Sequence, residues 1–371
     1  VSGDILDDDT AINTLTKAQK TSAEIEQQIA ASISTEKQIA IFREKFNQVS
    51  ERAALLYFCA SDFSIIDPMY QFSLKWFVNL FKNAVHNCPH SNDQSTLIQA
   101  LQHMIAVNFF NSVSISLFSA HKLLLSTLLA TRILSSERKI SSSELSFLIN
   151  PTPSDEPKQF EWMSDDVWKY FAALPKVSPV FEQLRESVSK NTKQWKAYAT
   201  STEPETETIP YNVDLSPFQK LILLRVFHLH RVQAVLRIFV TEALGEEFVN
   251  APPLNLMNVF KESSPTTPLI FITTPGIDPQ DEILQMASAM EFERYLNTYS
   301  LGHGRGPGAE ELILKAADRG YWVLLQNCHL SLSWMPHLEY LLDNLDPEKI
   351  SDRFRLFLVT MSSDKFPIGV L

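Results

Sequence analysis

The fold is decided by the stretch Leu269-Ile270-Phe271-Ile272, an uninterrupted apolar run. Such a run, without polar alternation, is typical of a strand that is buried on both faces. Strand and helix patterns alternate from this run onward. The expected strands are 269–272, 295–301, 322–325 and 354–360, and the expected helices are 280–290, 309–317 and 335–345. This alternation predicts an α/β fold in which helices cover both faces of a parallel sheet.

Glycine is distributed unevenly along the chain. The 371 residues contain 9 glycines, whereas an average usage of about 7% would give roughly 26. No glycine lies between Gly3 and Gly245, and six lie from Gly276 to Gly320. Because glycine supplies turns with positive φ, this distribution predicts a helical first part followed by a turn-rich α/β part.

The first part begins with the pattern of a long helix. Residues 10–49 contain no glycine or proline, and a narrow stripe recurs near heptad spacing: Leu15, Ala18, Ser22, Ile25, Ile29, Ser32, Ile39 and Phe46. At 1.5 Å per residue this helix is roughly 55 Å long. The stripe suits one arm of an antiparallel helical hairpin, with Ser2-Gly3-Asp4 at its tip and the carboxylates of residues 7–9 charging the helix N-terminus. A long helix packed on its own domain is the alternative.

Dense apolar patterns then predict helical bundles. The expected helices are 63–81, 98–118, 121–134, 141–148 and 216–244, and residues 162–195 are expected to form a polar helical connector. Asp67-Pro68 is an expected helix start, because proline is favoured in the first turn, and Gly245 an expected helix end. Proline-bounded breaks at 151–157 and 203–210 enclose a connector.

Charge and composition exclude several functional classes. A net charge of −11 provides no basic surface for nucleic acid or for an anionic membrane. Cys59, Cys88 and Cys328 are too few for a disulfide scaffold or a four-cysteine zinc site, which indicates a reducing compartment. The acidic N-terminus lacks a signal-peptide pattern. The most apolar span, 105–134, is interrupted by polar residues and predicts buried core rather than a membrane helix.

A glycine-rich string follows the second expected strand: Gly302-His303-Gly304-Arg305-Gly306-Pro307-Gly308-Ala309. Read from Gly304, it fits the G-x-G-x-x-A pattern of a dinucleotide-binding loop. It follows the second strand rather than the first, and Pro307 removes a backbone N–H that could face a phosphate. These features favour a structural loop. A dinucleotide- or nucleotide-binding enzyme that uses Gly302–Gly308 remains the alternative.

Two positions lack the groups that nucleotide hydrolysis requires. After the first strand the chain reads Thr273-Thr274-Pro275-Gly276-Ile277-Asp278-Pro279, which has no lysine, and Asp278 would repel phosphate. The third strand ends in neutral Gln326-Asn327, where acidic residues would handle Mg²⁺ and the attacking water. We therefore expect a degenerate phosphate loop at Pro275, Gly276 and Asp278, a degenerate acidic position at Gln326 and Asn327, and no bound cofactor.

Other groups of residues give weaker indications of a metal or catalytic site. His86-Asn87-Cys88-Pro89-His90 has zinc-ligand residue types but no second pair to complete a tetrahedral site, so a surface loop is favoured. His228 and His230 are two residues apart and therefore lie on different faces of the expected helix. The sequence contains no catalytic triad. We expect no catalytic residue and no metal site in this chain.

Many strings in the chain resemble dynein heavy chains. They are Ile5-Leu6-Asp7-Asp8, Leu56-Tyr57-Phe58, Ile66-Asp67-Pro68-Met69-Tyr70-Gln71-Phe72-Ser73-Leu74, His121-Lys122-Leu123-Leu124, Phe218-Gln219-Lys220-Leu221, Pro268-Leu269-Ile270-Phe271, Ser300-Leu301-Gly302, Gly306-Pro307 and Trp322-Val323-Leu324-Leu325-Gln326-Asn327-Cys328-His329-Leu330. The resemblance covers nearly the whole chain and is weakest from 152 to 210. The Leu325–Leu330 string and the alternating-glycine loop look like the axonemal branch.

The resemblance implies a place in a motor ring of six AAA+ modules. The expected divisions are 1–50, the distal buttress or strut; 51–150, the helical small (lid) subdomain of the fifth module; 151–210, a connector; and 211–371, the C-terminally truncated large α/β subdomain of the sixth module. In this family the sixth module lacks working nucleotide motifs. At residues 227–231 the chain reads Phe227-His228-Leu229-His230-Arg231, whereas relatives usually carry an Arg-Pro-Asp-Arg type of string. The aspartate of that string is missing here, which puts any contact that it makes in doubt.

The resemblance also implies a function. The whole protein would be an ATP-driven, minus-end-directed microtubule motor of the ciliary or flagellar axoneme, and this chain a non-catalytic, force-transmitting segment of it. Its implied partners are the neighbouring AAA+ modules and the stalk of the same heavy chain, the microtubule through that stalk, and the intermediate and light chains. ATP and Mg²⁺ would bind to other modules. The chain begins with Val1, so we expect a segment of a longer protein, and a stand-alone helical scaffold is a further alternative.

Overall fold

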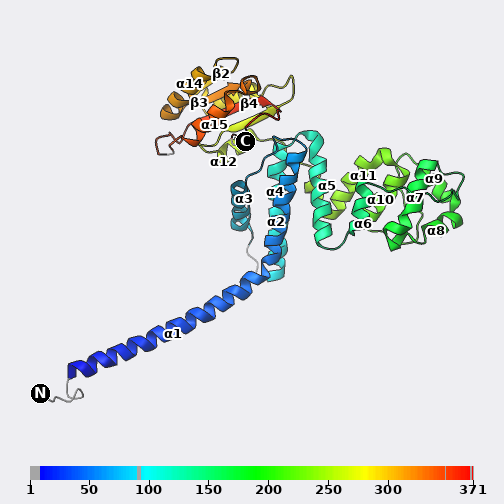
Figure 1. The fold of residues 1–371 in the computed structure, drawn as a ribbon, viewed down its shortest axis with the longest axis horizontal. Helices are drawn as coiled ribbons and strands as arrows, with labels where there is room; N and C mark the ends of the chain where they lie inside the picture. The colour runs from blue at the N-terminus through cyan, green and yellow to red at the C-terminus, as the bar shows by residue number, and fades with distance from the viewer. Residues whose placement is uncertain (1–8, 90–92, 347, 368–369, 371) are drawn as a thin grey trace.

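The computed structural model describes residues 9–89, 93–346, 348–367 and 370. A long helix leads into a helical region, and an α/β part with the C-terminus lies beyond it (Figure 1). This confirms the predicted fold class. The expected hairpin tip Ser2-Gly3-Asp4, the string Ile5–Asp8 and His90 lie outside the described residues.

The long N-terminal helix is α1 (Asp9–Lys45), with 37 residues. At 1.5 Å per residue it is about 55 Å long, and it projects away from the rest of the chain (Figure 1). Ile25, Ile29, Ile33 and Ile39 are each 46% to 52% exposed. Within the described residues, therefore, this apolar stripe is not covered by another helix. The helix ends at Lys45 rather than at Val49, because the chain turns at Phe46 before α2 begins.

The helical region contains ten further α-helices in the described residues. They are α2 (Asn47–Asp62), α3 (Leu74–Asn87), α4 (Gln94–Ser116), α5 (Ser119–Ser136), α6 (Ser142–Ile149), α7 (Asp165–Val177), α8 (Leu184–Lys190), α9 (Thr192–Thr200), α10 (Pro217–Phe227) and α11 (Val232–Leu244). Short 3₁₀ helices η2 (Phe63–Ile65), η3 (Pro179–Phe181), η4 (Leu229–Arg231) and η5 (Glu246–Phe248) join some of them. One apolar cluster, from Val49 to Phe248, is common to these helices.

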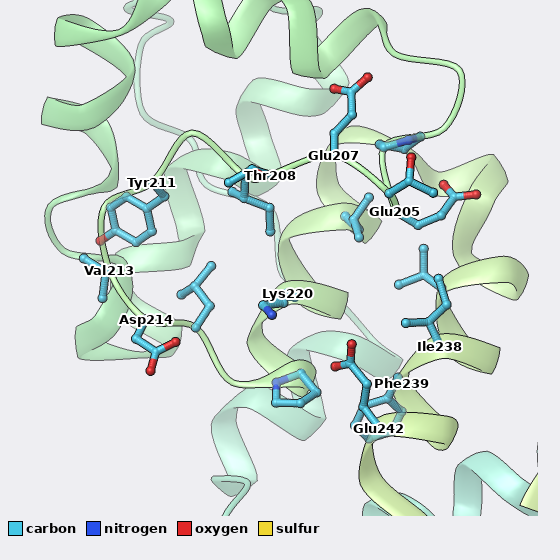
Figure 2. A pocket seen from close by; sticks show the side chains of 17 residues that line it. Glu205, Glu207, Thr208, Tyr211, Val213, Asp214, Lys220, Ile238, Phe239 and Glu242 are labelled. Carbon is cyan, nitrogen blue, oxygen red and sulfur yellow. The ribbon is translucent and has the colours of Figure 1, made fainter. Parts of the chain in front are cut away.

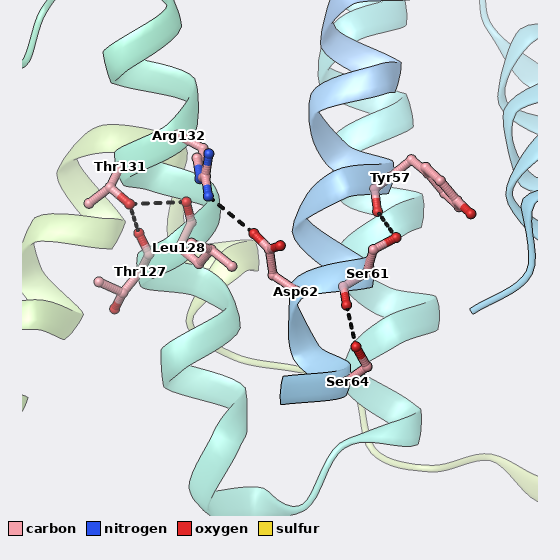
Figure 3. Close-up of polar contacts among 8 residues, drawn as sticks. All are labelled: Tyr57, Ser61, Asp62, Ser64, Thr127, Leu128, Thr131 and Arg132. Carbon is pink, nitrogen blue, oxygen red and sulfur yellow. Dashed lines mark hydrogen bonds and ion pairs between the residues drawn. The ribbon is translucent and has the colours of Figure 1, made fainter. Parts of the chain in front are cut away.

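Polar contacts between α2 and α5 add little to that core. Arg132 Nη2 lies 3.1 Å from Asp62 Oδ2 (Figure 3), but both side chains are about half exposed, so the pair contributes roughly 0.2–1 kcal/mol. The hydroxyls of Ser61 and Thr131 instead donate to carbonyl oxygens of their own helices. Apolar packing therefore holds the two helices together. Cys59 is buried in this packing, and burial raises its thiol pKa to about 12.

Two helix predictions were wrong. The helix expected to start at Asp67-Pro68 begins at Leu74, because Asp67 Oδ1 accepts the N–H of Met69 at 2.9 Å and keeps the segment in a turn. The capping side chain is Ser73, whose hydroxyl accepts the N–H of Trp76. Neither side-chain acceptor is visible in the hydrophobic spacing that predicted the helix.

The helix expected over 216–244 is broken at His228. There the backbone leaves helical geometry, with φ −136° and ψ 61°, and α11 folds back to pack against α10. His228 is 2% exposed, and its Nε2–H donates to the carbonyl oxygen of Tyr198 at 2.9 Å. A straight helix would not bring the two residues together in this way.

The α/β part contains a four-stranded parallel sheet of order β1-β4-β3-β2. Its elements are β1 (Leu269–Thr273), β2 (Leu296–Ser300), β3 (Trp322–Gln326) and β4 (Arg355–Met361), with α12 (Leu256–Glu262), α13 (Gln280–Ala289), α14 (Gly306–Arg319), α15 (Met335–Asp343), η6 (Glu293–Tyr295) and η7 (Cys328–Ser331). In the register of the sheet, Leu269 is opposite Phe357 and Leu296 is opposite Trp322.

Alternate side chains of β3 and β4 are buried on opposite faces of the sheet. One apolar cluster contains Val323, Leu325, Leu356 and Leu358 with residues of α14 and α15. The other contains Trp322, Leu324, Phe357 and Val359 with residues of α12 and α13. The predicted coverage of both faces is confirmed for the two central strands.

The apolar clusters divide the chain at a different place from the expected domains. The helical cluster continues to Phe248, and the sheet clusters begin with Phe260, apart from Met69, which packs into one of them. Residues 211–248 thus share a core with the preceding helices. The assignment of 1–50, 51–150, 151–210 and 211–371 to named subdomains stays a prediction. No described helix is both long and apolar enough to span a membrane.

Candidate functional site

The candidate site lies where β1 and β3 end. In parallel α/β sheets, ligands bind outside the carboxyl ends of the strands. Pro275, Gly276 and Asp278 lie in the loop between β1 and α13, and Gln326 and Asn327 lie at the end of β3. These residues therefore lie at the edge of the sheet where a nucleotide would be expected to bind.

The loop after β1 is short and open. The N–H of Ile277 donates to the carbonyl oxygen of Thr274 at 3.1 Å, which closes a tight turn. Gly276 has φ +90°, and a Cβ there would meet no atom within 4 Å. Pro275, Gly276 and Asp278 are all exposed. This glycine serves the turn and does not bring the backbone close to a bound group.

The N-terminus of α13 is unfavourable for an anion. Asp278 Oδ1 accepts the N–H of Gln280 at 3.0 Å, so one of the donors that a phosphate would use is already satisfied. Asp281 and Glu282 follow in the first turn. Their negative charge would repel a phosphate at the position where the helix dipole would otherwise attract it.

The structure brings Gln326 and Asp278 together. Gln326 Nε2 lies 2.7 Å from Gln280 Oε1 and 3.4 Å from Asp278 Oδ2. An uncharged amide therefore connects the end of β3 to the start of α13. Hydrolysing sites use a carboxylate in this place to hold Mg²⁺. The Gln326 amide has no negative charge for that role, and its Nε2 is already directed at Gln280 and Asp278.

Asn327 is directed elsewhere. It has φ 58° and ψ 37°, a left-handed conformation that asparagine tolerates, and its Nδ2 donates to Ser300 Oγ at 3.0 Å. Cys328 is fully buried, and burial raises its pKa to about 12, so it is a neutral thiol. His329 Nδ1 accepts the N–H of Met361 at 3.4 Å. These side chains serve the connection between β3 and its neighbouring strands.

The glycine loop has a packing role. A Cβ on Gly306 would lie 2.4 Å from Trp334 Cδ1, and a Cβ on Gly308 would lie 2.5 Å from the Tyr299 hydroxyl. The Arg305 guanidinium stacks 4.9 Å from the centre of the Tyr299 ring. Both glycines thus permit side chains of this chain to approach the backbone closely.

Sheet order also differs from that of a dinucleotide fold. In the 3-2-1-4-5-6 order, the first and second strands are neighbours near the centre, and the glycine loop follows the first strand. Here β1 and β2 are at opposite ends of the described order, and the loop Gly302–Gly308 follows β2. The topology does not favour the dinucleotide alternative.

A cavity lies in the helical region (Figure 2). It has a volume of about 370 Å³ and is formed by the segment 204–217 with α10 and α11. Its charged lining residues are Glu205, Glu207, Asp214, Lys220 and Glu242. Glu205 forms an ion pair with Arg231. The excess of carboxylates is unsuited to phosphate ligands. Sequence reasoning missed this cavity because the fold-back of α11 assembles it, although the acidic segment after Glu203 was a local signal.

The described residues contain no group of three or more His, Cys, Asp and Glu side chains arranged to hold a metal ion. The zinc-like string contributes exposed His86 and buried Cys88, with His90 outside the described residues. His228 is buried, whereas His230 is exposed beside it.

His228 should make stability depend on pH. Burial lowers the pKa of His228 below its ordinary 6.5, so the unfolded state binds more protons between the folded and unfolded pKa values. The free energy of unfolding should therefore fall as pH drops below about 6.5. Denaturant titrations from pH 7.5 to about pH 5 should show this slope in the native chain. His228→Gln keeps a donor for Tyr198 without titrating and should flatten the slope; an unchanged slope would assign it to other groups.

Comparisons with known proteins identify similar chains. Residues 264–371 match the family described as the dynein heavy chain region D6 P-loop domain. The whole chain aligns with dynein axonemal heavy chain 1 of Rattus norvegicus, 36% identical over 375 residues, and of Homo sapiens, 35% identical over 381 residues. It also aligns with the dynein-1-beta heavy chain of the flagellar inner arm I1 complex of Chlamydomonas reinhardtii, 32% identical over 379 residues. The chain spans only 8% or 9% of the length of these relatives.

Proposed function

Because this chain belongs to the dynein heavy chain family, we propose that it is a non-catalytic, force-transmitting segment of an axonemal motor. The whole heavy chain would move toward microtubule minus ends in cilia or flagella, driven by ATP and Mg²⁺ bound in other modules. This segment would pass conformational change between those modules and the stalk that binds the microtubule. Its partners would be the adjoining AAA+ modules and stalk, and the intermediate and light chains of the complex.

The observation that carries this proposal is the contact between Gln326 and the start of α13. A parallel sheet of nucleotide-binding type is retained, with both faces of its central strands packed. The positions that would hold phosphate and Mg²⁺ have instead an exposed turn, the carboxylate of Asp278 and a neutral amide. This combination supports a fold that is kept for its shape rather than for hydrolysis.

The long helix α1 supports the transmission role. Its half-exposed isoleucines suit a second helix packed along it, as in the buttress hairpin that we propose for residues 1–50. Backbone hydrogen bonds continue through the junction: the N–H of Phe46 donates to the carbonyl oxygen of Arg43 in α1, and the N–H groups of Val49 and Ser50 in α2 donate to that of Phe46. Displacement of α1 would therefore move α2 with it.

The base of this arm is fixed to the helical region. Arg52 of α2 is 13% exposed and forms an ion pair with Glu137 at 2.7 Å, after the end of α5. Lys45 Nζ also donates to Gln94 Oε1 at 2.9 Å, at the start of α4. A shear motion between packed helices could then pass from the ring to the stalk through this base.

Nucleotide binding tests the non-catalytic part of the proposal. Calorimetric titration of MgATP into the 371-residue chain should give no saturable binding in the micromolar range. The loop after β1 has no lysine to bind the phosphates, and the end of β3 has no carboxylate to hold Mg²⁺. The full-length heavy chain is the positive control. Saturable micromolar binding to this chain would contradict the proposal.

Softening α1 tests the transmission part. In the full-length motor, Ile25→Gly with Ile29→Gly should reduce the stimulation of ATPase rate by microtubules, because each glycine costs a helix interior about 0.5–1 kcal/mol relative to alanine. The matched control is Ile25→Ala with Ile29→Ala, which removes the same side chains but keeps the helix stiff. The additional loss of stimulation in the glycine variant, relative to the alanine variant, measures the contribution of helix stiffness. Equal stimulation in both variants would count against transmission through a rigid α1.

A further inference from the structure

A groove in the helical region is lined by an unusual number of asparagines. It lies between α3, α4 and residues 252–259 and has a volume of about 1060 Å³. Asn79, Asn83 and Asn87 line it from α3, and Asn108 and Asn111 line it from α4. The helices α3 and α4 run side by side (Figure 1), so these side chains border one continuous space.

The carboxamides of these five asparagines are unused within the described residues, whereas that of Asn255, which also lines the groove, accepts the N–H of Asn258. None of the five side chains makes a hydrogen bond to another described residue, and Asn79, Asn83 and Asn87 are exposed. Asparagine is also among the weaker helix formers. A row of three in α3 therefore offers neither an internal contact nor good helix propensity, which directs attention to an external ligand.

The spacing of the row matches an extended polypeptide. Residues four apart on a helix are separated by about 6 Å along its axis, and residues two apart on an extended chain are separated by about 6.6 Å. Each carboxamide carries one acceptor oxygen and two donor hydrogens. Successive asparagines can thus accept a main-chain N–H and donate to a main-chain carbonyl at every second residue of a peptide.

We propose that this groove binds an extended, acidic peptide segment of a partner protein. The amide row of α3 holds the peptide main chain, with Asn108 and Asn111 on the opposite side. Lys82, the lysine of the groove, has no carboxylate partner within the described residues, and it selects acidic side chains by charge. This proposal is independent of the motor function proposed above.

The probe is a fluorescein-labelled peptide of about ten residues that alternates threonine with glutamate. Fluorescence anisotropy measures its binding to the full-length heavy chain. The triple variant N79A/N83A/N87A should bind about a hundredfold more weakly, since each lost amide contact is expected to cost roughly fivefold. Alanine is the better helix former, so α3 is retained. The matched control is N47A/N212A/N250A, which removes three exposed asparagines outside the groove and should leave binding unchanged.

Two further measurements separate main-chain recognition from charge. The same peptide with N-methyl groups on alternate residues loses main-chain N–H donors. It should bind the native heavy chain as weakly as the unmodified peptide binds the triple variant. Lys82→Gln should weaken binding of the threonine–glutamate peptide but not of a peptide in which glutamine replaces glutamate. No binding to the native heavy chain, equal binding of the N-methylated peptide, or equal loss in the control variant would overturn the proposal.

Discussion

Gly306→Ala is expected to destabilise the α/β part by about 1–3 kcal/mol, the usual cost of forcing an extra methyl group into packed structure. The new Cβ would lie 2.4 Å from Trp334 Cδ1 and 2.6 Å from Cγ and Nε1. In an open helix the same change would stabilise, because alanine has the higher helix propensity. A loss of stability rather than a gain would therefore indicate that Trp334 packs closely against Gly306. Urea denaturation followed by tryptophan fluorescence measures it.

Gly302→Ala is the matched control. Its nearest atom would be Arg305 Cδ at 3.9 Å, an ordinary contact, so the free energy of unfolding should change by less than about 0.5 kcal/mol. The double variant Gly306→Ala with Trp334→Ala should lose less unfolding free energy than the sum of the two single variants, because the new Cβ no longer meets the indole. A neutral or stabilising Gly306→Ala would contradict the packing role. Loss of a bound dinucleotide in Gly306→Val would support the alternative enzyme function.

Trp322→Ala should have the largest effect, a loss of about 3–5 kcal/mol, as for other large-to-small changes in a core. Trp322 is 1% exposed, and its ring lies 4.7 Å from that of Phe260, 4.8 Å from that of Phe292 and 5.5 Å from that of Phe357. Its Nε1–H also donates to the carbonyl oxygen of Arg353 at 3.1 Å. The substitution would leave a cavity where α12 and η6 meet the sheet.

Hydrogen exchange can localise this loss. Amides of β3 and β4 should lose protection, whereas those of α2 and α4 should keep it, because the helical region has a separate apolar cluster. Trp322→Phe should cost less, since it keeps most of the ring contacts. Tyr340→Ala, at a side chain that is 65% exposed, is the surface control. Equal loss of protection in both regions would show that the two clusters unfold as one unit.

The sequence alone predicted most elements of the α/β part. Apolar runs such as Leu269–Ile272 and Trp322–Leu325 are strands in the structure, with ends that differ by one residue. The run 322–325 is buried at every position, as a strand that is covered on both faces requires, whereas the run 269–272 forms a strand at the end of the described order and is only partly buried. The same reasoning failed at Asp67 and His228, where a side-chain hydrogen bond overrides an apolar spacing that continues.

For the site, the sequence alone established which charges are present. A loop with Asp278 and without lysine, and a strand that ends in neutral Gln326, are chemical facts that no folding can change. Only the tertiary structure decided that Gln326 reaches Asp278 and Gln280. Nothing in the local pattern specifies that contact, because the two loops are distant in the chain.

The glycine loop shows the same division most clearly. The spacing from Gly302 to Gly308 established that the backbone there can be approached closely. It did not establish what approaches, since a phosphate and an indole need the same missing Cβ. The packing of Trp334 against Gly306 and of Tyr299 against Gly308 decided that question. Residue types determine which interactions are possible, and the folded chain determines which partners come within reach.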